Sequence, residues 1–352
     1  MNRKISIYHF GQFKERVPFY YTSYRPYFSQ FFEYVDNPER ADFLVCGFFG
    51  DIKAYSEFIA DVRSKNENVQ LVVLSEEPLW DTLWYYRWER PIHDVIVEVD
   101  GTTQKWSFHF VNHANSDIFD FYKLPYFITT ENLYTQRYYQ LLKLSSSLSS
   151  KDLLKRWQQS KSRYSFVAEK RLRDAYHKED HNSQLLGLSV YRTRLAMEVQ
   201  EQHSEATYCM GKGWESENTR QSLADWHLNK IITLSDDNFV VSAIENTVLD
   251  NYISEKPFDA LSLGGFPIYW ANESHRIHEF LSSDSMINIA GLDYKRAARL
   301  IIEFEPTLLN AEALIQARLS LLKRLSIKNA LAEERCLVAA KTYLHFSNLP
   351  HL

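Results

Sequence analysis

Residues 238–270 contain the stretch that decides the fold, NFVVSAIENTVLDNYISEKPFDALSLGGFPIYW. Asn238–Ile244 is mostly β-branched and aromatic, which is typical of a buried strand, and Phe266–Trp270 has the same character. Between them, Ser254–Leu263 has the pattern of a helix, with a serine that can cap its start and Pro257 in its first turn. Two glycines follow and end the helix. The stretch therefore predicts a strand–loop–helix–strand unit.

The start of this helix is rich in polar and charged residues. A helix N-terminus exposes unpaired N–H groups and the positive end of the helix dipole, so it suits an anion. Lys256 adds a full positive charge at this point. The same residues also fit an ordinary crossover between strands, in which Glu255 and Lys256 are merely solvated. The pattern alone leaves both interpretations open.

The run Glu245–Lys256 resembles the core motif of glycosyltransferase family 10, the alpha-1,3/4-fucosyltransferase family. That motif is Glu-Asn-(Ser/Thr), four variable residues, then Tyr-(Val/Ile)-(Ser/Thr)-Glu-Lys, and the spacing here matches without a gap. The later Pro-Ile-Tyr-Trp is similar to the family's next strand, and the similarity extends over about residues 160–290. The resemblance implies a GT-B fold, in which two Rossmann-like domains face a cleft, and a nucleotide sugar as the donor.

The resemblance also implies which residues line the donor site. Carried over to this sequence, they are Asn246, Tyr252, Glu255 and Lys256. We expect Lys256 and Tyr252 at the phosphates, Glu255 at the ribose hydroxyls, and Asn246 at the sugar or an adjacent phosphate. Glu245 is either a further donor contact or a brace for the loop, because buried carboxylates often accept backbone N–H groups.

A departing pyrophosphate needs positive charge, which many glycosyltransferases supply with a divalent ion at an Asp-x-Asp element. This sequence contains no Asp-x-Asp, so we expect no metal, and cationic side chains and helix-end amides take its place. Arg192 and Arg194, in the segment YRTRLAMEV, resemble the family's Arg-x-Arg element, with Arg192 at the donor-phosphate position. A guanidinium group binds phosphate oxygens in a bidentate way. The alternative is that both arginines are solvated charges on a helix face.

An inverting transfer also needs a base that accepts the proton of the acceptor hydroxyl. The segment LVVLSEEP, residues 71–78, places Glu76 and Glu77 directly beyond an apolar strand, where ligand sites form in parallel sheets. It resembles the family's Glu-Ser-Pro element, with Glu76 on the glutamate. We therefore expect Glu76 as the catalytic base, with Glu77 as its rival. An acidic turn before Pro78 is the structural alternative.

The pattern along the chain predicts the α/β class, with two Rossmann-like halves and a helical C-terminal tail. We expect an acceptor-binding domain over residues 1–150 and a donor domain with the tail over residues 160–352, joined by a serine-rich linker. Strands alternate with helices, which favours parallel pairing. In the first half the expected strands are Lys4–Phe10, Phe43–Phe49, Gln70–Leu74 and His93–Val99, and the expected helices are Tyr27–Tyr34 and Ile52–Lys65. In the second half we expect strands Tyr164–Ala168 and Ala206–Met210, a helix over Tyr191–His203, and a helix-rich tail over Ala311–Phe346.

Composition narrows the class of protein. The chain of 352 residues has a net charge of −5, which argues against a nucleic-acid partner. Three widely spaced cysteines fit a reducing compartment. The N-terminus lacks a signal-peptide pattern, and no run approaches the roughly 18 apolar residues of a membrane span. We therefore expect a cytoplasmic protein of the bacterial soluble type. The helical tail leaves two further possibilities open, which are peripheral contact with the inner membrane and a homodimer.

Together these features predict an inverting, metal-independent transfer of fucose from GDP-fucose to a hydroxyl of a bacterial surface glycan. The acceptor would be an oligosaccharide or a glycolipid, such as lipopolysaccharide with its O-antigen, or a capsule repeat. The sequence departs from the family where Glu169 and Lys170 replace Ser-Asn and where Ala271 replaces a glycine. These departures leave the transferred sugar open, so another GDP-deoxysugar or nucleotide sugar is an alternative. A glycan- or nucleotide-binding protein without catalysis is a second alternative.

Overall fold

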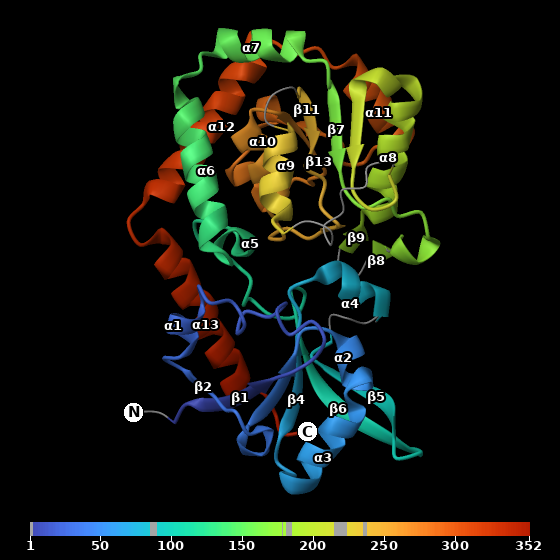
Figure 1. Ribbon diagram of the computed structural model, residues 1–352, viewed down its shortest axis with the longest axis vertical. Helices are drawn as coiled ribbons and strands as arrows, with labels where there is room; N and C mark the ends of the chain where they lie inside the picture. The colour runs from blue at the N-terminus through green and yellow to red at the C-terminus, as the bar shows by residue number, and fades with distance from the viewer. Residues whose placement is uncertain (1–2, 85–89, 178, 181–184, 215–223, 235–237) are drawn as a thin grey trace. The chain divides into compact units, whose positions relative to one another are not determined.

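The computed structural model describes residues 3–352 except 85–89, 178, 181–184, 215–223 and 235–237 (Figure 1). The chain forms two compact units, of which the first contains residues 1–132 and 329–352 and the second residues 133–328. Each unit is built on a largely parallel sheet with helices, so the predicted α/β class is confirmed. The first boundary, after residue 132, lies before the expected linker at residues 150–160, and residues 329–352 return to the first unit.

The sheet of the first unit has the strand order β2-β1-β3-β4-β6-β5, and all its neighbouring strands are parallel except the hairpin β5–β6. The pattern did not predict β2, which lies where we expected the end of a helix, nor β6. An Asp-Gly pair, Asp100 and Gly101, connects β5 to β6 with positive φ angles of 48° and 72°, as a tight hairpin turn requires. The strands are β1 (Ile5–His9), β2 (Phe32–Tyr34), β3 (Phe43–Cys46), β4 (Gln70–Leu74), β5 (Ile92–Val99) and β6 (Thr102–Val111).

Aromatic side chains fill the core of the first unit. Phe19 packs edge to face on Phe28 and Phe32, with ring centroids 4.6 and 4.9 Å apart, and Phe346 joins them from the other end of the chain. Such contacts add to the stability that burial of the rings provides. The helices of this part of the chain are α1 (Arg25–Phe28), α2 (Phe49–Ala54), α3 (Ser56–Lys65), α4 (Pro78–Trp84) and α5 (Tyr126–Thr129).

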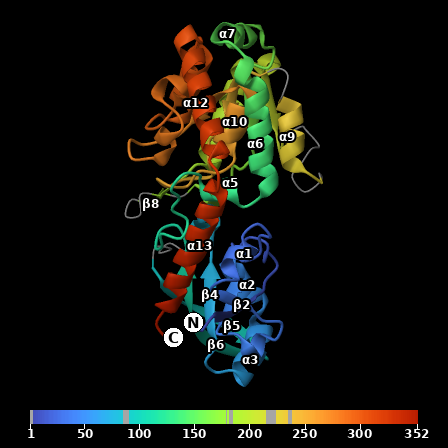
Figure 2. The same ribbon diagram turned by 90° about the vertical axis from the view of Figure 1, so that its left-hand side faces the viewer.

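The C-terminal tail is divided between the two units. Instead of one helical stretch, it forms α12 (Leu308–Ser326) and α13 (Ala330–Ser347), separated at Asn329, whose φ of 69° is left-handed. Asparagine tolerates this conformation better than most residues. The break lets α12 pack on the second unit while α13 packs against α1 and α5 of the first (Figure 2). The last helix therefore does not belong to the expected donor domain.

The sheet of the second unit is parallel throughout, in the order β10-β7-β11-β13-β14. The chain runs from β7 to β10 on one side and then returns to β11 on the other, so the strand order reverses beside β7. Parallel sheets bind ligands beyond the carboxyl ends of the strands at such a point. The strands are β7 (Tyr164–Val167), β10 (Thr207–Met210), β11 (Val240–Ser242), β13 (Phe266–Tyr269) and β14 (Ile287–Asn288), and an antiparallel patch contains β8 (Glu179–Asp180), β9 (Leu185–Gly187) and β12 (Thr247–Val248).

The predicted strand–loop–helix–strand unit is present as β11, α10 and β13, and α9 packs beside α10 (Figure 1). Gly264 ends α10 with a φ of 73°, as expected, and a side chain at Gly265 would collide with Val241. Within the described residues, no helix is long and apolar enough to cross a membrane. The helices are α6 (Asn132–Leu144), α7 (Ser150–Gln159), α8 (Ser189–Gln202), α9 (Trp226–Leu234), α10 (Lys256–Leu263), α11 (Tyr294–Glu303) and α12.

One carboxylate anchors α13 to the first unit. Glu334, which is 3% exposed, accepts the N–H groups of Tyr122 at 3.0 Å and Leu124 at 3.1 Å, and also that of Lys123. Helix α13 is therefore fixed by polar contacts as well as by its aromatic end.

We expect Glu334→Ala to lower the free energy of unfolding of the first unit by about 2–4 kcal/mol, because several buried N–H groups lose their acceptor. Urea denaturation followed by tryptophan fluorescence measures the loss. The matched control is Glu333→Ala, which removes the neighbouring carboxylate, 56% exposed and paired with Lys123. Exposed ion pairs contribute little. Equal losses for the two variants would contradict the anchoring role.

Candidate functional site

The second unit gathers its charged motif residues at the start of α10. The carboxylate of Glu245 is buried just beyond the end of β11. Its Oε1 accepts the N–H of Ser254 at 2.7 Å, and its Oε2 accepts the hydroxyl of Ser254 at 2.7 Å and the ammonium of Lys256 at 2.8 Å. Glu245 therefore braces the loop, one of the two roles expected for it, and fixes Lys256 as well.

The expected cap of α10 is wrong. The residue at the N-cap position is Glu255, in a helical conformation and without a capping side chain, because the hydroxyl of Ser254 is bonded to Glu245 instead. Pro257 does lie in the first turn, as predicted. The loss of a side-chain cap leaves first-turn N–H groups of α10 available to a ligand.

Lys256 and Glu255 reach toward solvent from this position. The side chain of Lys256 is 17% exposed and that of Glu255 is 33% exposed, whereas Glu245 behind them is buried. The Nζ of Lys256 lies 2.7 Å from the hydroxyl of Ser254 and 3.8 Å from Oε1 of Glu255. The ammonium group is thus held in place by three oxygens and still accessible.

Arg192 of α8 lies buried near the same carboxylates. It is 6% exposed, and its Nη1 donates to the carbonyl oxygen of Ile244 at 3.3 Å, while its Nε has no hydrogen-bond partner among the described residues. Burial, together with the charge of Arg171, lowers the pKa of Arg192 to about 10, although Glu245 and Glu255 act in the opposite direction. A buried cation with an unsatisfied donor is costly, and a bound anion would offset that cost.

The structure does not bring Arg194 to this group. Residues two apart on a helix point in nearly opposite directions. Arg194 is exposed, and its guanidinium lies over the ring of Tyr294 on α11, 5.9 Å from the centroid. Its placement fits the interpretation as a charge on a helix face.

The two remaining motif residues lie in the loop between β11 and α10. Asn246 is half-buried, and its carbonyl oxygen accepts the N–H of Leu188 at 2.7 Å, which ties the loop to the start of α8. Tyr252 is buried, and its N–H donates to the carbonyl oxygen of Leu249 at 3.0 Å. The loop therefore links the helices that carry Arg192 and Lys256.

In the first unit, the two expected acids follow β4. Glu76 is 1% exposed, and its oxygens accept the phenol hydroxyls of Tyr21 at 2.6 Å and Tyr126 at 2.7 Å. Arg16 pairs with Glu77 and lies 3.7 Å from Glu76. Both acids are thus buried and bonded. These three partners were not predictable from the sequence, since they lie far from Glu76 along the chain and belong to no recognisable motif.

Two further titratable groups lie beside this pair. His113 is stacked on Phe119, with centroids 4.3 Å apart, and its Nε2 lies 3.2 Å from the carbonyl oxygen of Glu76. Burial lowers the pKa of His113 to about 3, so the ring stays neutral. Asp81, one turn into α4, is fully buried, and that burial raises its pKa well above the usual range.

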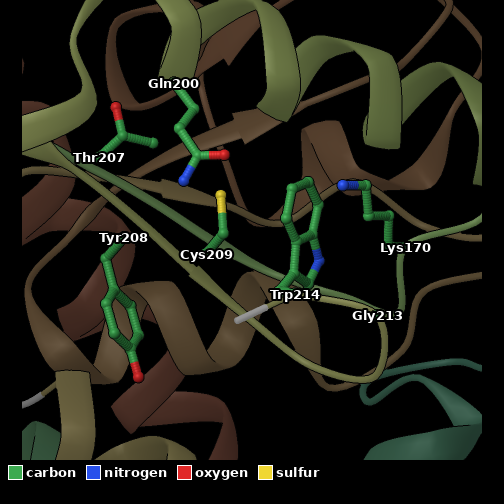
Figure 3. A pocket seen from close by; sticks show the side chains of 7 residues that line it. All are labelled: Lys170, Gln200, Thr207, Tyr208, Cys209, Gly213 and Trp214. Carbon is green, nitrogen blue, oxygen red and sulfur yellow. The ribbon is translucent and has the colours of Figure 1, made fainter. Parts of the chain in front are cut away.

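A pocket of about 390 Å³ opens beside β10 and α8 (Figure 3). The ring of Trp214 is fixed there by a hydrogen bond of 2.8 Å from its Nε1 to the carbonyl oxygen of Ala168, and Lys170 lies over the ring at 4.9 Å. The lining residues are Lys170, Gln200, Thr207, Tyr208, Cys209, Gly213 and Trp214. The segment after Lys170 contacts α8 next to Arg192, since the N–H of Arg171 donates to the hydroxyl of Thr193 at 3.0 Å.

Among the residues that the structure describes, no cluster of three or more His, Cys, Asp or Glu side chains is placed to hold a metal ion. Cys46 is buried, Cys209 half-buried and Cys336 exposed, and all three are free of disulfides.

Comparison with known proteins gives a remote likeness only. No family model and no curated protein matches the chain. Among solved structures, an alpha1,3-fucosyltransferase with GDP-fucose is similar with a TM-score of 0.47 and 14% identity, covering 99% of this chain and 93% of that one. Structures of alpha1,3-fucosyltransferase (16% identity) and of alpha1,3-fucosyltransferase with GDP (15% identity) each have a TM-score of 0.45 and cover 97% of this chain and 90% of theirs. At these values the likeness carries no argument about activity.

The neutral His113 makes the stability of the first unit depend on pH. Its pKa in the folded state, about 3, lies below its ordinary value of 6.5, so the unfolded chain binds a proton that the folded chain refuses. The contribution of His113 is therefore fully present above about pH 6.5 and is lost as the pH falls toward 3.

We expect the stability lost between pH 7 and pH 5 to shrink by about 2 kcal/mol in His113→Phe, which keeps the ring contact and removes the titration. Urea denaturation at both pH values measures the difference. An unchanged loss in the variant would show that His113 does not titrate in this way.

Proposed function

We propose that this chain is an inverting glycosyltransferase that moves fucose from GDP-fucose to a hydroxyl of a bacterial surface glycan. The observation that carries the proposal is that Lys256 at the start of α10 and Arg192 on α8 both lie near Glu245 and Glu255, beyond the carboxyl end of β11. Lys256 is fixed by Glu245 and partly exposed, and Arg192 is buried with an unsatisfied donor. Both features suit a diphosphate.

These groups would stabilise the charge that develops on the leaving GDP. When the bond between the anomeric carbon and the β-phosphate oxygen breaks, negative charge grows on the diphosphate. Donors that are already oriented lower the barrier, because little reorganisation is needed during the reaction. Lys256, Arg192 and the first-turn N–H groups of α10 meet that requirement without a metal. GDP-fucose is then the only co-substrate besides the acceptor.

The remaining motif residues complete the proposed donor site. Glu255 is exposed enough to accept hydrogen bonds from the ribose hydroxyls. Asn246, in the loop that touches α8, would contact the sugar or a neighbouring phosphate, and the phenol of Tyr252 a phosphate. We leave Arg194 out of the proposed site, since it points away from Arg192 on α8 and contacts the ring of Tyr294.

The proposed reaction forms one bond and breaks one. The acceptor hydroxyl attacks the anomeric carbon from the side opposite GDP, so a β-linked donor gives an α-linked product, and the hydroxyl proton passes to a carboxylate. We assign that carboxylate to Glu76, with Glu77 as the rival. Each carboxylate oxygen has two lone pairs, so the hydrogen bonds from Tyr21 and Tyr126 leave Glu76 able to accept a proton.

The acceptor and the compartment belong to the proposal as well. The first unit, which carries Glu76, would bind an oligosaccharide or glycolipid of the lipopolysaccharide or capsule class. The three free cysteines are consistent with a cytoplasmic reaction.

A second candidate function is glycan or nucleotide binding without catalysis. The burial of Glu76 and Glu77, both held by hydrogen bonds or an ion pair, favours it, because a base must reach its substrate. A transferase with the same chemistry and a different nucleotide sugar is the other alternative. The measurements that follow distinguish each alternative from the proposed fucosyl transfer.

Calorimetric titration with GDP, UDP, CMP and ADP, with and without EDTA, tests the donor. We expect micromolar binding of GDP alone, unchanged by EDTA. Preference for UDP or CMP would contradict GDP-fucose, and binding that needs a metal would contradict the role given to Lys256 and Arg192.

Two arginines of α8 provide the matched control for this titration. Arg192→Ala should weaken GDP binding by about 10- to 100-fold, as expected for the loss of a charged hydrogen bond, and Arg194→Ala by less than about twofold. Equal losses would show that the site is not where we place it.

Glu76→Gln separates an enzyme from a binding protein. We expect this variant to lose turnover by about 100-fold or more while keeping its affinity for GDP, because the amide cannot accept the acceptor proton. Release of GDP from GDP-fucose in the presence of bacterial glycans measures turnover, and calorimetry measures affinity. Glu77→Gln should keep most of the activity. The reverse result would make Glu77 the base, and no loss in either variant would exclude both.

A further inference from the structure

A buried lysine outside the motif lies behind the proposed donor site. Lys230 of α9 is 5% exposed and forms an ion pair with Asp259 of α10. Its Nζ also lies 3.8 Å from Oε1 of Glu255. Lysine is rarely buried to this extent unless its charge is compensated, as Asp259 compensates it here.

The partner of Lys230 is itself held by two other helices. Oδ1 of Asp259 lies 2.8 Å from the hydroxyl of Tyr138 on α6 and 2.8 Å from Nε2 of His227 on α9. Burial alone would lower the pKa of Lys230, but the charges of Asp259 and Glu255 outweigh it and raise that pKa. The ammonium group is therefore charged and fixed.

Glu255 is placed between two cations. Its Oε1 lies 3.8 Å from the Nζ of Lys230 and 3.8 Å from the Nζ of Lys256. Continuing from Lys256 to Glu245 at 2.8 Å, charges of opposite sign alternate, and the series is buried at both ends, Asp259 and Glu245, and most exposed at Glu255. Water moderates the attraction around the part-exposed Glu255, and the attraction is strongest on the buried side of Lys230.

The position of Lys230 affects how much positive charge Lys256 can offer to a diphosphate. If Lys230 were absent, the Glu255 carboxylate would be drawn toward Lys256 and would neutralise the charge that a phosphate needs. With Lys230 behind it, Glu255 is shared between two ammonium groups, and its orientation is set from the interior. Lys256 then keeps charge to offer to an anion.

We propose that Lys230 is a positioning residue of the donor site, which orients Glu255 and preserves the charge of Lys256 for the diphosphate of a nucleotide. The inference rests on the proposed function, since it names a residue that acts on the same site. It differs from a purely structural role, in which Lys230 would only neutralise Asp259 and would have no influence on a ligand.

A double-mutant cycle on GDP affinity distinguishes these roles. Lys230→Met would leave Asp259 as an unpaired buried charge and could fail to fold, so the variant used is Lys230→Met combined with Asp259→Asn, which removes the ion pair as a unit. It is measured by calorimetry in the native background and in the background of Glu255→Gln. Lys155→Met, on the exposed face of α7, is the matched control.

We expect the pair substitution to weaken GDP binding about tenfold in the native background and less than about twofold when Glu255 is already a glutamine, because the lysine acts through that carboxylate. The single substitution Lys230→Arg, which keeps a cation beside Asp259, should retain most of the native affinity for GDP. Guanosine, which has no phosphate, should bind equally to all of the variants.

Equal losses in both backgrounds, or an equal loss of guanosine and GDP binding, would overturn the positioning role and leave Lys230 a structural residue. That outcome would not affect the proposed function, which is tested separately by the nucleotide preference of the native protein and by the turnover of the Glu76 and Glu77 variants. Lys155→Met should leave the affinity unchanged.

Discussion

The second unit depends most on the carboxylate of Glu245. Three hydrogen bonds converge on this buried group, two from Ser254 and one from Lys256, and they close the loop that joins β11 to α10. A buried charge of this kind is stable only when it is paired and fully hydrogen-bonded. The same contacts that satisfy Glu245 therefore fix the start of α10, deprive the helix of a serine cap, and aim Lys256 outward.

The cations around α10 are balanced before any ligand binds. Lys256 pairs with Glu245, Lys230 with Asp259, and Glu255 is shared between the two lysines. Arg192 differs because, among the residues that the structure describes, its Nε has no hydrogen-bond partner and no salt bridge holds it. Preorganisation of this type limits the cost of ordering side chains on binding. The most specific contribution to anion binding is thus expected from the least satisfied group, Arg192, and the general positive field from Lys256.

The candidate site was predictable wherever it lies in one short stretch. The motif from Glu245 to Lys256 could be quoted from the sequence, and its strand, loop and helix are present as expected. The partners of Glu76 could not be predicted, since Tyr21 and Tyr126 lie about fifty residues away on either side and carry no local signal. The Arg-x-Arg resemblance favoured Arg192 over Arg194 as the phosphate-binding residue, but the contact of Arg194 with the ring of Tyr294 is apparent only in the tertiary structure.

The sequence by itself determined the α/β class, most strands of both units, and the charged residues at the start of α10, because period, turn residues and local spacing act over a few positions. The tertiary structure alone decided the rest. It divided the tail at Asn329 and gave α13 to the first unit, buried Lys230 behind Glu255, and turned Ser254 from a cap into a ligand of Glu245. Each of these outcomes depends on which distant groups satisfy a buried charge or cover an aromatic core, and that choice is made only when the chain is packed.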